Sequence, residues 1–255
     1  MQYTLKKSLG QHFLTDESIC VKIMQALQKS LEHSGAVQLV EVGPGGGALT
    51  KYLLQIPDID FKAVELDREK VDFLEATYAS IKGKIIHQDF LKIDAPFDGQ
   101  FIAAGNFPYN ISTQIVFKIL DWKAQVPVMI GMFQKEVAQR IASKPGSKVY
   151  GIMSVLVQAF YNVEYLFDVP PGAFNPPPKV MSGVIKLTRK TESINFKSER
   201  SFFVLVKAAF NQRRKMLRNA VKGQFDEDVL KEDIFTKRAE QLSIEDFAAL
   251  TFKMK

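Results

Sequence analysis

The chain has 255 residues, 46% hydrophobic and 24% charged, an ordinary composition for a soluble globular protein of one or two domains. Its single cysteine excludes an internal disulfide framework, and three histidines without a ligand-like spacing argue against a metal centre. The net charge of +6 favours a polyanionic partner, although many basic proteins bind no nucleic acid.

The N-terminal residues lack the apolar core of a signal peptide. No segment approaches the ~20 consecutive apolar residues of a membrane helix. We therefore expect a cytoplasmic protein with no membrane partner and no bound metal.

The first part of the chain alternates predicted helices and strands. Asp16 can cap a helix that ends at Gly35, and later helices are predicted over 113–120, 134–143 and 151–160. The predicted strands are 37–42, 61–66, 84–87, 101–105 and 126–133. This alternation predicts a parallel sheet with helices on both faces, and the continuously apolar strands agree with it.

The alternation ends after residue 160. Two strand candidates, 165–169 and 180–187, are joined by a proline-rich connection with no room for a helix, so we expect antiparallel neighbours. Residues 199–255 predict helices only, over 200–222, 227–233, 236–241 and 244–252. We therefore predict a sheet domain at 1–190 and a small helical domain at 191–255.

Three successive predicted strands end in residues suited to a nucleotide-like cofactor. The first turns into a helix through Glu41-Val42-Gly43-Pro44-Gly45-Gly46-Gly47, where glycines let the backbone approach a ligand beside free helix amides. Glu65 follows about 20 residues on, where an acid can bind ribose hydroxyls. Asp89 ends the third strand and could accept from an adenine amine. Each alone is more simply a turn or a capping acid, but together they favour a binding site.

Two cofactors fit this pattern. Gly43-x-Gly45-x-x-Ala48 also satisfies the dinucleotide fingerprint, so both NAD and S-adenosylmethionine are candidates. No histidine follows His87 to act in hydride transfer, and an antiparallel end pair is typical of methyltransferase sheets. The sequence thus favours S-adenosylmethionine and an α/β, Rossmann-like class I methyltransferase fold, with a dehydrogenase as the weakest alternative.

The fourth strand ends in Gly105-Asn106-Phe107-Pro108-Tyr109. The amide could accept hydrogen bonds from a planar amine while the aromatic ring stacks on the base. Asn and Pro are also common in simple turns. The place of this motif after three cofactor residues favours the functional interpretation.

Five motifs in chain order resemble the KsgA family of ribosomal RNA adenine dimethylases. They are Lys7-Ser8-Leu9-Gly10-Gln11-His12-Phe13-Leu14, the glycine-rich loop, Asn106-Phe107-Pro108-Tyr109-Asn110-Ile111-Ser112-Thr113, Gly172-Ala173-Phe174-x-Pro176-x-Pro178-Lys179-Val180 and Asn211-Gln212-Arg213-Arg214-Lys215-x-Leu217-Arg218-Asn219. The resemblance implies S-adenosylmethionine-dependent N6-dimethylation of two adjacent adenosines near the 3′ end of small-subunit rRNA, with a role in ribosome biogenesis.

The resemblance also implies roles for individual residues. The cofactor would contact His12, Leu14, Gly43, Glu65, Asp89 and Asn106. Asn106 and the backbone carbonyl of Phe107 would accept from the adenine amine and aim its lone pair, so that catalysis is mainly positioning. Tyr109 and Phe174 would stack on the two sides of a flipped base. The family frequently has Asn at position 12 and Leu at position 107.

A basic stretch near the C-terminus is the candidate RNA contact. No Asp or Glu occurs between residues 200 and 225, and the RNA-binding candidates are Arg213, Arg214, Lys215, Arg218 and Lys222. Arg214, Arg218 and Lys222 would share one face of the predicted helix 200–222, although a solvated face is the simpler alternative. Lys6, Lys7, Lys144, Lys148 and Lys179 could extend the surface.

We therefore predict a monomeric methyltransferase of small-subunit rRNA that acts on a precursor of the small ribosomal subunit. The nearest alternative is an erythromycin-resistance-type enzyme that methylates adenine in large-subunit rRNA. A third is a non-enzymatic assembly factor that keeps the fold as an RNA-binding scaffold.

Overall fold

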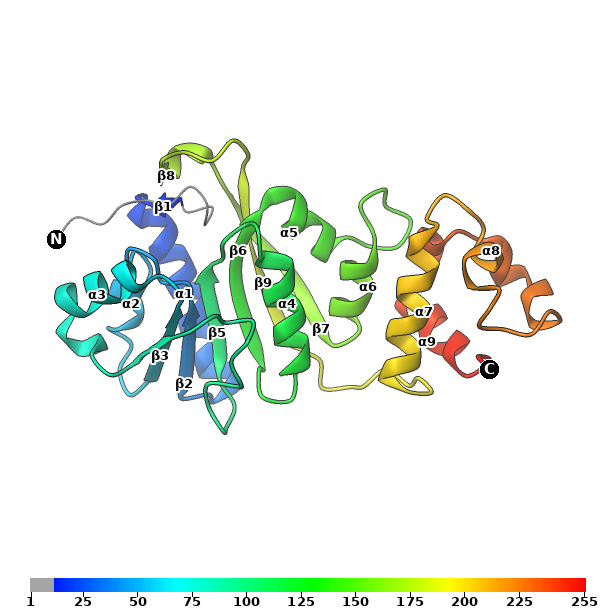
Figure 1. Ribbon diagram of the computed structural model, residues 1–255, viewed down its shortest axis with the longest axis horizontal. Helices are drawn as coiled ribbons and strands as arrows, with labels where there is room; N and C mark the ends of the chain where they lie inside the picture. The colour runs from blue at the N-terminus through cyan, green and yellow to red at the C-terminus, as the bar shows by residue number, and fades with distance from the viewer. Residues whose placement is uncertain (1–11) are drawn as a thin grey trace. The chain divides into compact units, whose positions relative to one another are not determined.

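The computed structural model describes residues 12–255 (Figure 1). Contacts within the chain divide it into two compact units. The first contains the chain up to Ala138 together with Glu164–Arg189, and the second contains Gln139–Val163 and Lys190–Lys255. Residues 6–11, which carry two of the predicted basic side chains and part of the N-terminal motif, lie outside the described residues.

The first unit is built on a seven-stranded sheet in the order β4-β3-β2-β5-β6-β9-β7, of which the start of β7, up to Val163, is counted in the second unit. Its strands are β2 Gln38–Val42, β3 Asp60–Glu65, β4 Ile85–His87, β5 Ile102–Asn106, β6 Val128–Gln134, β7 Tyr161–Val169 and β9 Ser182–Arg189. The pairs β4–β3, β3–β2, β2–β5 and β5–β6 are parallel, and β9 is antiparallel to β6. The predicted α/β fold with an antiparallel end strand is confirmed.

Helices cover the sheet of the first unit. They are α1 Glu17–Ser34, α2 Thr50–Leu53, α3 Arg68–Thr77, α4 Ser112–Asp121 and α5 Lys135–Ala142, with short 3-10 helices η2 Ala79–Ile81 and η3 Pro171–Ala173. The second half of α5, from Gln139, is counted in the second unit. Ile102 and Ala104 of β5 pack in one core cluster with Leu27 of α1. Ala103, which faces the other way between them, is fully buried too. Both faces of the sheet are therefore covered, which explains why the strands are continuously apolar.

The start of α1 shows how local sequence sets an element. The Asp16 side chain accepts from the Ser18 backbone N–H at 2.9 Å and caps the first turn. Gly35 ends the helix in the left-handed conformation, with φ of 64°. Both predicted ends of this helix are confirmed.

A second, two-stranded sheet joins distant parts of the first unit. β1 Phe13–Leu14 pairs with β8 Phe174–Asn175, so that Leu14 lies opposite Phe174. The Thr15 backbone N–H donates to the Ala173 carbonyl at 2.8 Å. The sequence analysis predicts neither of these two strands, so this pairing is a finding of the structure.

The second unit is helical. Its helices are α6 Ile152–Gln158, α7 Glu199–Asn211, α8 Leu217–Val221 and α9 Ile244–Thr251, with 3-10 helices η4 Val229–Lys231, η5 Asp233–Thr236 and η6 Ala239–Gln241. Phe210 of α7 contacts Tyr150 and Phe247, with ring centroids 6.1 and 5.9 Å apart. Through Tyr150, residues just before α6 join this core, which explains why 139–163 group with the C-terminal helices and not with the sheet domain predicted at 1–190.

The single helix predicted over 200–222 is wrong. α7 ends at Asn211, and a turn separates it from α8. Met216 is extended, with φ of −60° and ψ of 147°, and it pairs with Arg238 in an isolated antiparallel bridge. Leu217 donates its backbone N–H to the Lys237 carbonyl at 2.7 Å. This tertiary pairing replaces the helical hydrogen bonds that the sequence pattern alone would favour.

The predicted helices 227–233 and 236–241 are short 3-10 turns in the structure. Between residues 12 and 255, no helix combines the length and apolar character that crossing a bilayer requires.

Candidate functional site

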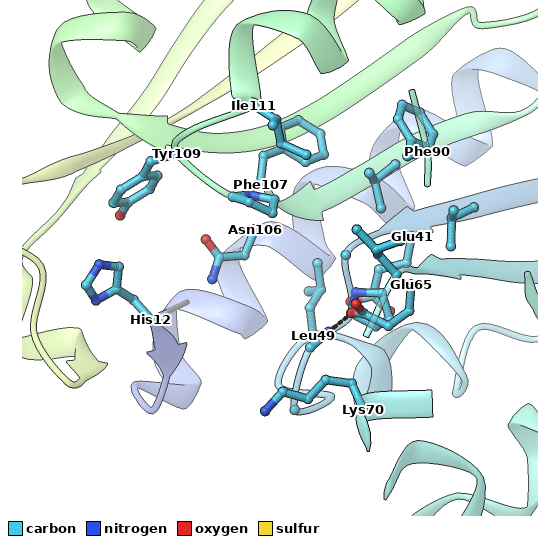
Figure 2. A pocket seen from close by; sticks show the side chains of 18 of the residues that line it. His12, Glu41, Leu49, Glu65, Lys70, Phe90, Asn106, Phe107, Tyr109 and Ile111 are labelled. Carbon is cyan, nitrogen blue, oxygen red and sulfur yellow. Dashed lines mark hydrogen bonds between the residues drawn. The ribbon is translucent and has the colours of Figure 1, made fainter. Parts of the chain in front are cut away.

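A cavity of about 240 Å³ lies at the carboxyl ends of four neighbouring parallel strands (Figure 2). The strands are β4, β3, β2 and β5, and chain order reverses between β2 and β5, where open α/β sheets bind their ligands. Eight predicted site residues line the cavity: His12, Leu14, Gly43, Glu65, Asp89, Asn106, Phe107 and Tyr109. Parallel pairing thus brings together residues from Gly43 to Tyr109, 66 positions apart, and the pairing of β1 with β8 adds His12 and Leu14.

The glycine-rich loop forms one wall of the cavity. Gly43 and Gly45 adopt the left-handed backbone conformation, with φ of 69° and 55°. The Gly43 N–H donates to the Val64 carbonyl at 2.9 Å, and the Gly45 N–H donates to Glu65 Oε2 at 3.0 Å. The loop is therefore fastened to the end of β3 in a shape that side chains larger than glycine rarely adopt.

Glu65 holds the corner between β3 and α3. Its Oε1 accepts from the Asp67 N–H at 2.9 Å while its Oε2 accepts from Gly45. Burial raises the pKa of this carboxyl, and the backbone hydrogen bonds act in the opposite direction. Each carboxylate oxygen can accept more than one hydrogen bond, so Glu65 can also accept from the hydroxyl groups of a ligand beside the loop.

Glu41 is a second carboxyl in the cavity wall, and it is only 2% exposed. Thr50 Oγ1 donates to its Oε2 at 2.6 Å. Burial raises the pKa of Glu41 to about 8, and the neighbouring Glu65 adds to the effect. The sequence identifies Glu41 only as the start of the glycine motif, because burial of its carboxyl depends on the surrounding sheet.

Asp89 follows β4 and is partly exposed in the cavity wall. Its Oδ1 accepts from the Leu91 N–H at 3.0 Å, which turns the chain across the end of the strand. Phe90 and Leu66, which also line the cavity, give this end of it an apolar surface. A carboxylate beside apolar side chains suits an aromatic ring that carries an amine.

Asn106 is the last residue of β5, and Figure 2 shows its amide pointing into the cavity on the side of His12. Next to it, the ring of Phe107 is 1% exposed and packs edge-on against Phe133, with centroids 5.2 Å apart. The Phe107 ring lies over two paired glycines, Gly105 and Gly131. A Cβ on Gly131 would lie 2.2 Å from Phe107 Cε2. The side chain of Phe107 is therefore part of the core, and its backbone N–H donates to the Met132 carbonyl at 3.3 Å, which leaves its backbone carbonyl for ligand contacts.

Tyr109 is held by a residue far away in the sequence. Its hydroxyl lies 2.5 Å from Ser182 Oγ, at the start of β9. Burial raises the pKa of the Tyr109 phenol, so the hydroxyl keeps its proton near neutral pH. No sequence signal indicates Ser182, because only the sheet order brings the first residue of β9 to this position.

His12 lies beside Tyr109, with ring centroids 5.7 Å apart. Its Nδ1 lies 2.9 Å from the Pro176 carbonyl oxygen, which can only accept, so Nδ1 carries the proton and donates. Leu14 is buried next to it in β1. The residues predicted to close over the cofactor thus line the cavity from the β1 side.

Phe174 is not among the residues that the structure places in the cavity wall. It is 4% exposed and belongs to the hydrophobic core cluster, opposite Leu14 in the small sheet. The sequence predicts Phe174 as a stacking ring, and in the structure its pairing with β1 buries it.

The five basic candidates lie in the second unit. Arg214, Lys215, Arg218 and Lys222 are exposed, whereas Arg213 is half-buried. Arg214 precedes α8 and lies outside any helix, so the predicted helical face of Arg214, Arg218 and Lys222 is wrong. Within residues 12–255, no group of three or more His, Cys, Asp or Glu side chains could hold a metal ion.

A family model described as ribosomal RNA adenine dimethylase matches residues 2–253. The chain is 52% identical over 254 residues to the ribosomal RNA small subunit methyltransferase A of Flavobacterium johnsoniae. That match covers 98% of this chain and 95% of the relative.

Two solved structures share the fold. A dimethyladenosine transferase from Plasmodium falciparum superposes with a TM-score of 0.77 at 24% identity, covering 92% of this chain and 94% of that one. The 23S rRNA methyltransferase ErmE superposes with a TM-score of 0.69 at 20% identity, covering 93% of this chain and 99% of that one.

Proposed function

Because the chain belongs to the ribosomal RNA adenine dimethylase family, we propose that it dimethylates the exocyclic amines of two adjacent adenosines near the 3′ end of small-subunit rRNA. The protein is a methyltransferase and its cofactor is S-adenosylmethionine. The observation that carries the proposal is the position of Asn106, at the end of the fourth of four strands whose ends line one cavity.

The residues around the cavity fit this cofactor. Glu65, beside the left-handed glycines, is placed to accept from ribose hydroxyls, and Asp89 is placed to accept from the adenine amine. Leu66 and Phe90 offer apolar surface to the adenine ring. When bound, S-adenosylmethionine supplies a methyl group activated by a positively charged sulfur, and the acidic lining suits that charge.

Asn106 and Phe107 orient the amine that is methylated. The adenine amine is a weak nucleophile because its lone pair is delocalised into the ring. Acceptors at the Asn106 side chain and the Phe107 carbonyl favour the pyramidal amine and aim the lone pair. No strong general base is required, so the site acts mainly by positioning.

Tyr109 is the stacking surface for a flipped base. Its ring is fixed at the hydroxyl by Ser182, which supports this role. We keep Phe174 as a second stacking candidate, and this role requires its ring to leave the core position that it occupies beside β1.

The choice of the small subunit is supported by sequence identity. The chain is 52% identical to a small-subunit methyltransferase and 20% identical to ErmE, which methylates 23S rRNA, so the latter likeness concerns the fold alone. The retained Asn106 site and cofactor cavity also favour an enzyme over a non-catalytic assembly factor.

We further propose that residues 191–255 form an RNA-binding domain, to whose unit 139–163 also belong, and that the rest of residues 1–190 forms the catalytic domain. Arg213, Arg214, Lys215, Arg218 and Lys222 are the predicted RNA contacts. The protein would act as a monomer on precursors of the small subunit, in the cytoplasm where they assemble.

The test uses radiolabelled methyl transfer to separated ribosomal subunits whose rRNA lacks the two dimethyladenosines. We expect label on adenines of the small subunit, and label on the large subunit alone would refute the proposal. Asn106→Ala should abolish transfer while the affinity for S-adenosylmethionine changes little. Unchanged turnover in this variant would remove Asn106 from the mechanism.

A further inference from the structure

The five basic candidates of the second unit are not equivalent, and this inference rests on their proposed role in binding RNA. Arg214, Lys215, Arg218 and Lys222 are exposed, as a phosphate contact must be. The side chain of Arg213 is 38% exposed and is engaged within the protein. The sequence treats Arg213 and Arg214 alike because both stand in one basic run.

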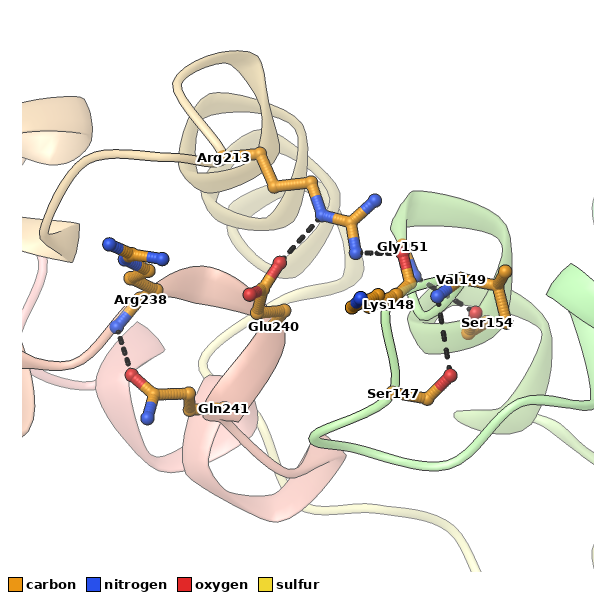
Figure 3. A network of polar contacts seen from close by, with 9 residues as sticks. All are labelled: Ser147, Lys148, Val149, Gly151, Ser154, Arg213, Arg238, Glu240 and Gln241. Carbon is orange, nitrogen blue, oxygen red and sulfur yellow. Dashed lines mark hydrogen bonds and ion pairs between the residues drawn. The ribbon is translucent and has the colours of Figure 1, made fainter.

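Arg213 bridges two segments of the second unit (Figure 3). Its Nε donates to Glu240 Oε2 at 2.7 Å, and its Nη2 donates to the Lys148 backbone carbonyl. A guanidinium holds its Nε and Nη donors in a fixed planar fork, so it spans two separated acceptors in a way that the single nitrogen of an ammonium group does not reproduce. The charge of Arg213 is at the same time offset by Glu240.

The loop that carries Lys144 and Lys148 has a second attachment at the same place. The Gly146 backbone N–H donates to the Glu240 carbonyl at 2.7 Å. Glu240 therefore holds this loop in two ways. Its side chain binds Arg213, which bonds the Lys148 carbonyl, and its own backbone carbonyl accepts directly from Gly146. Lys144 and Lys148 are both exposed.

A third basic segment, which contains Lys237 and Arg238, is bonded to the residues that follow Arg213. The bridge between Met216 and Arg238 and the bond from Leu217 to Lys237 fasten the turn before η6 to the segment that follows Arg213. Lys237 and Arg238 are exposed. The segments joined at this ion pair thus carry three exposed basic pairs: Lys144 and Lys148, Arg214 and Lys215, and Lys237 and Arg238.

We propose that Arg213 is a positioning residue for RNA binding: through Glu240 and the Lys148 carbonyl it holds the loop of Lys144 and Lys148 to the segments of the other two basic pairs, so that all three form one surface for a nucleic-acid phosphate backbone. The exposed pairs contact phosphate, and Arg213 acts through them. A surface that is fixed before binding loses less conformational entropy when the phosphates are bound. Lys237 and Arg238 join the RNA contacts that the sequence predicts.

Neutralising Glu240 distinguishes the proposed positioning role from a direct contact between Arg213 and phosphate, because the two roles predict opposite changes in RNA affinity. If Arg213 bound phosphate directly, Glu240→Gln would remove a competing acid and strengthen RNA binding. If Arg213 holds the loops, the same change weakens binding although it makes the protein more positive. Glu227→Gln, at an exposed position of the same unit, controls for the change in net charge.

Binding is measured with small-subunit rRNA transcribed in vitro, over a range of salt concentrations. We expect Glu240→Gln and Arg213→Lys each to weaken binding about 5-fold, and the double variant to be no weaker than either one. Hydrogen exchange should be faster over residues 144–150 in both. Arg214→Gln should instead lower the slope of log affinity against log salt by about 1, with unchanged exchange in that loop.

Binding by Glu240→Gln that is stronger than, or equal to, that of Glu227→Gln would overturn the inference. If Glu240→Gln fails to fold, Arg213→Lys serves as the test instead, and unchanged RNA affinity in that variant would overturn the inference as well. Failure of the unmodified protein to bind the transcript would instead refute the proposed function, so the two failures are distinct.

Discussion

The Tyr109 hydroxyl lies 2.5 Å from Ser182 Oγ, and Ser182 is fully buried at the first position of β9. Tyr109 leaves the sheet after β5, so this hydrogen bond spans β6, the strand between them. The orientation of a proposed base-stacking ring is thus set by the antiparallel strand.

Ser182→Ala should lower the rate of methyl transfer about 10-fold while the affinity for S-adenosylmethionine is kept. The partly buried Tyr109 hydroxyl loses its hydrogen-bond partner in this variant, and the ring is no longer held in its orientation. Tyr109→Phe retains the ring without the hydroxyl. If the hydrogen bond is the cause, the double variant should be no slower than Ser182→Ala. Additive losses would show that the two residues act separately.

Gly131→Ala should lower the free energy of unfolding by about 1–3 kcal/mol, because the added Cβ would overlap the Phe107 ring. Leu is shorter than Phe, so Phe107→Leu in the same protein should restore part of the loss. Thermal melts of the single and double variants measure this. Equal melting temperatures for Gly131→Ala and the unmodified protein would contradict the predicted overlap.

Glu41 should make the protein less stable as the pH rises. Its pKa is raised from 4.5 to about 8, so between these values the folded state holds a proton that the unfolded state has lost. The free energy of unfolding should therefore fall across this range, by an amount on the order of a few kcal/mol, and level off outside it.

Glu41→Gln removes the titrating group and keeps an acceptor for Thr50 Oγ1. Denaturant unfolding at several pH values between 4.5 and about 8 should give a shallower decline for this variant than for the unmodified protein. An identical pH profile would show that Glu41 does not carry the effect.

Glu65→Gln should weaken S-adenosylmethionine binding about 10-fold or more, because the amide cannot accept from Gly45 and Asp67 with both of its ends. Calorimetric titration measures the loss, with NAD titrated in parallel. Glu75→Gln on α3 is the matched control and should bind the cofactor normally. Binding of NAD alone by the unmodified protein would contradict the cofactor assignment.

Much of the site is predictable from the sequence because its residues lie at the ends of predicted strands. Glu65 and Asn106 end parallel strands, and Gly43 and Asp89 follow such strands by one and two residues. Parallel strands bring these ends to one edge of the sheet whatever the details of packing. Periodicity and apolar runs are local signals, and they were sufficient for this part of the fold.

The remaining features depend on contacts between distant segments. Met216 pairs with Arg238, and this pairing interrupts a stretch that has good helical periodicity. Phe174 is buried because it pairs with β1. Arg213 differs from Arg214 only through Glu240 and the Lys148 carbonyl. None of these partners can be identified from the residues around the position in question.

The pairing of β1 with β8 has a consequence for exchanging parts between related enzymes. The segment that carries His12 and Leu14 along the cofactor cavity is hydrogen-bonded to residues 173–176, and the same connection leads directly into Ser182. A chimera that takes the proline-rich connection from another enzyme therefore inherits a new partner for its own N-terminal segment. Cofactor affinity and base orientation should change together in such a chimera, unless the N-terminal segment is transplanted from the same donor.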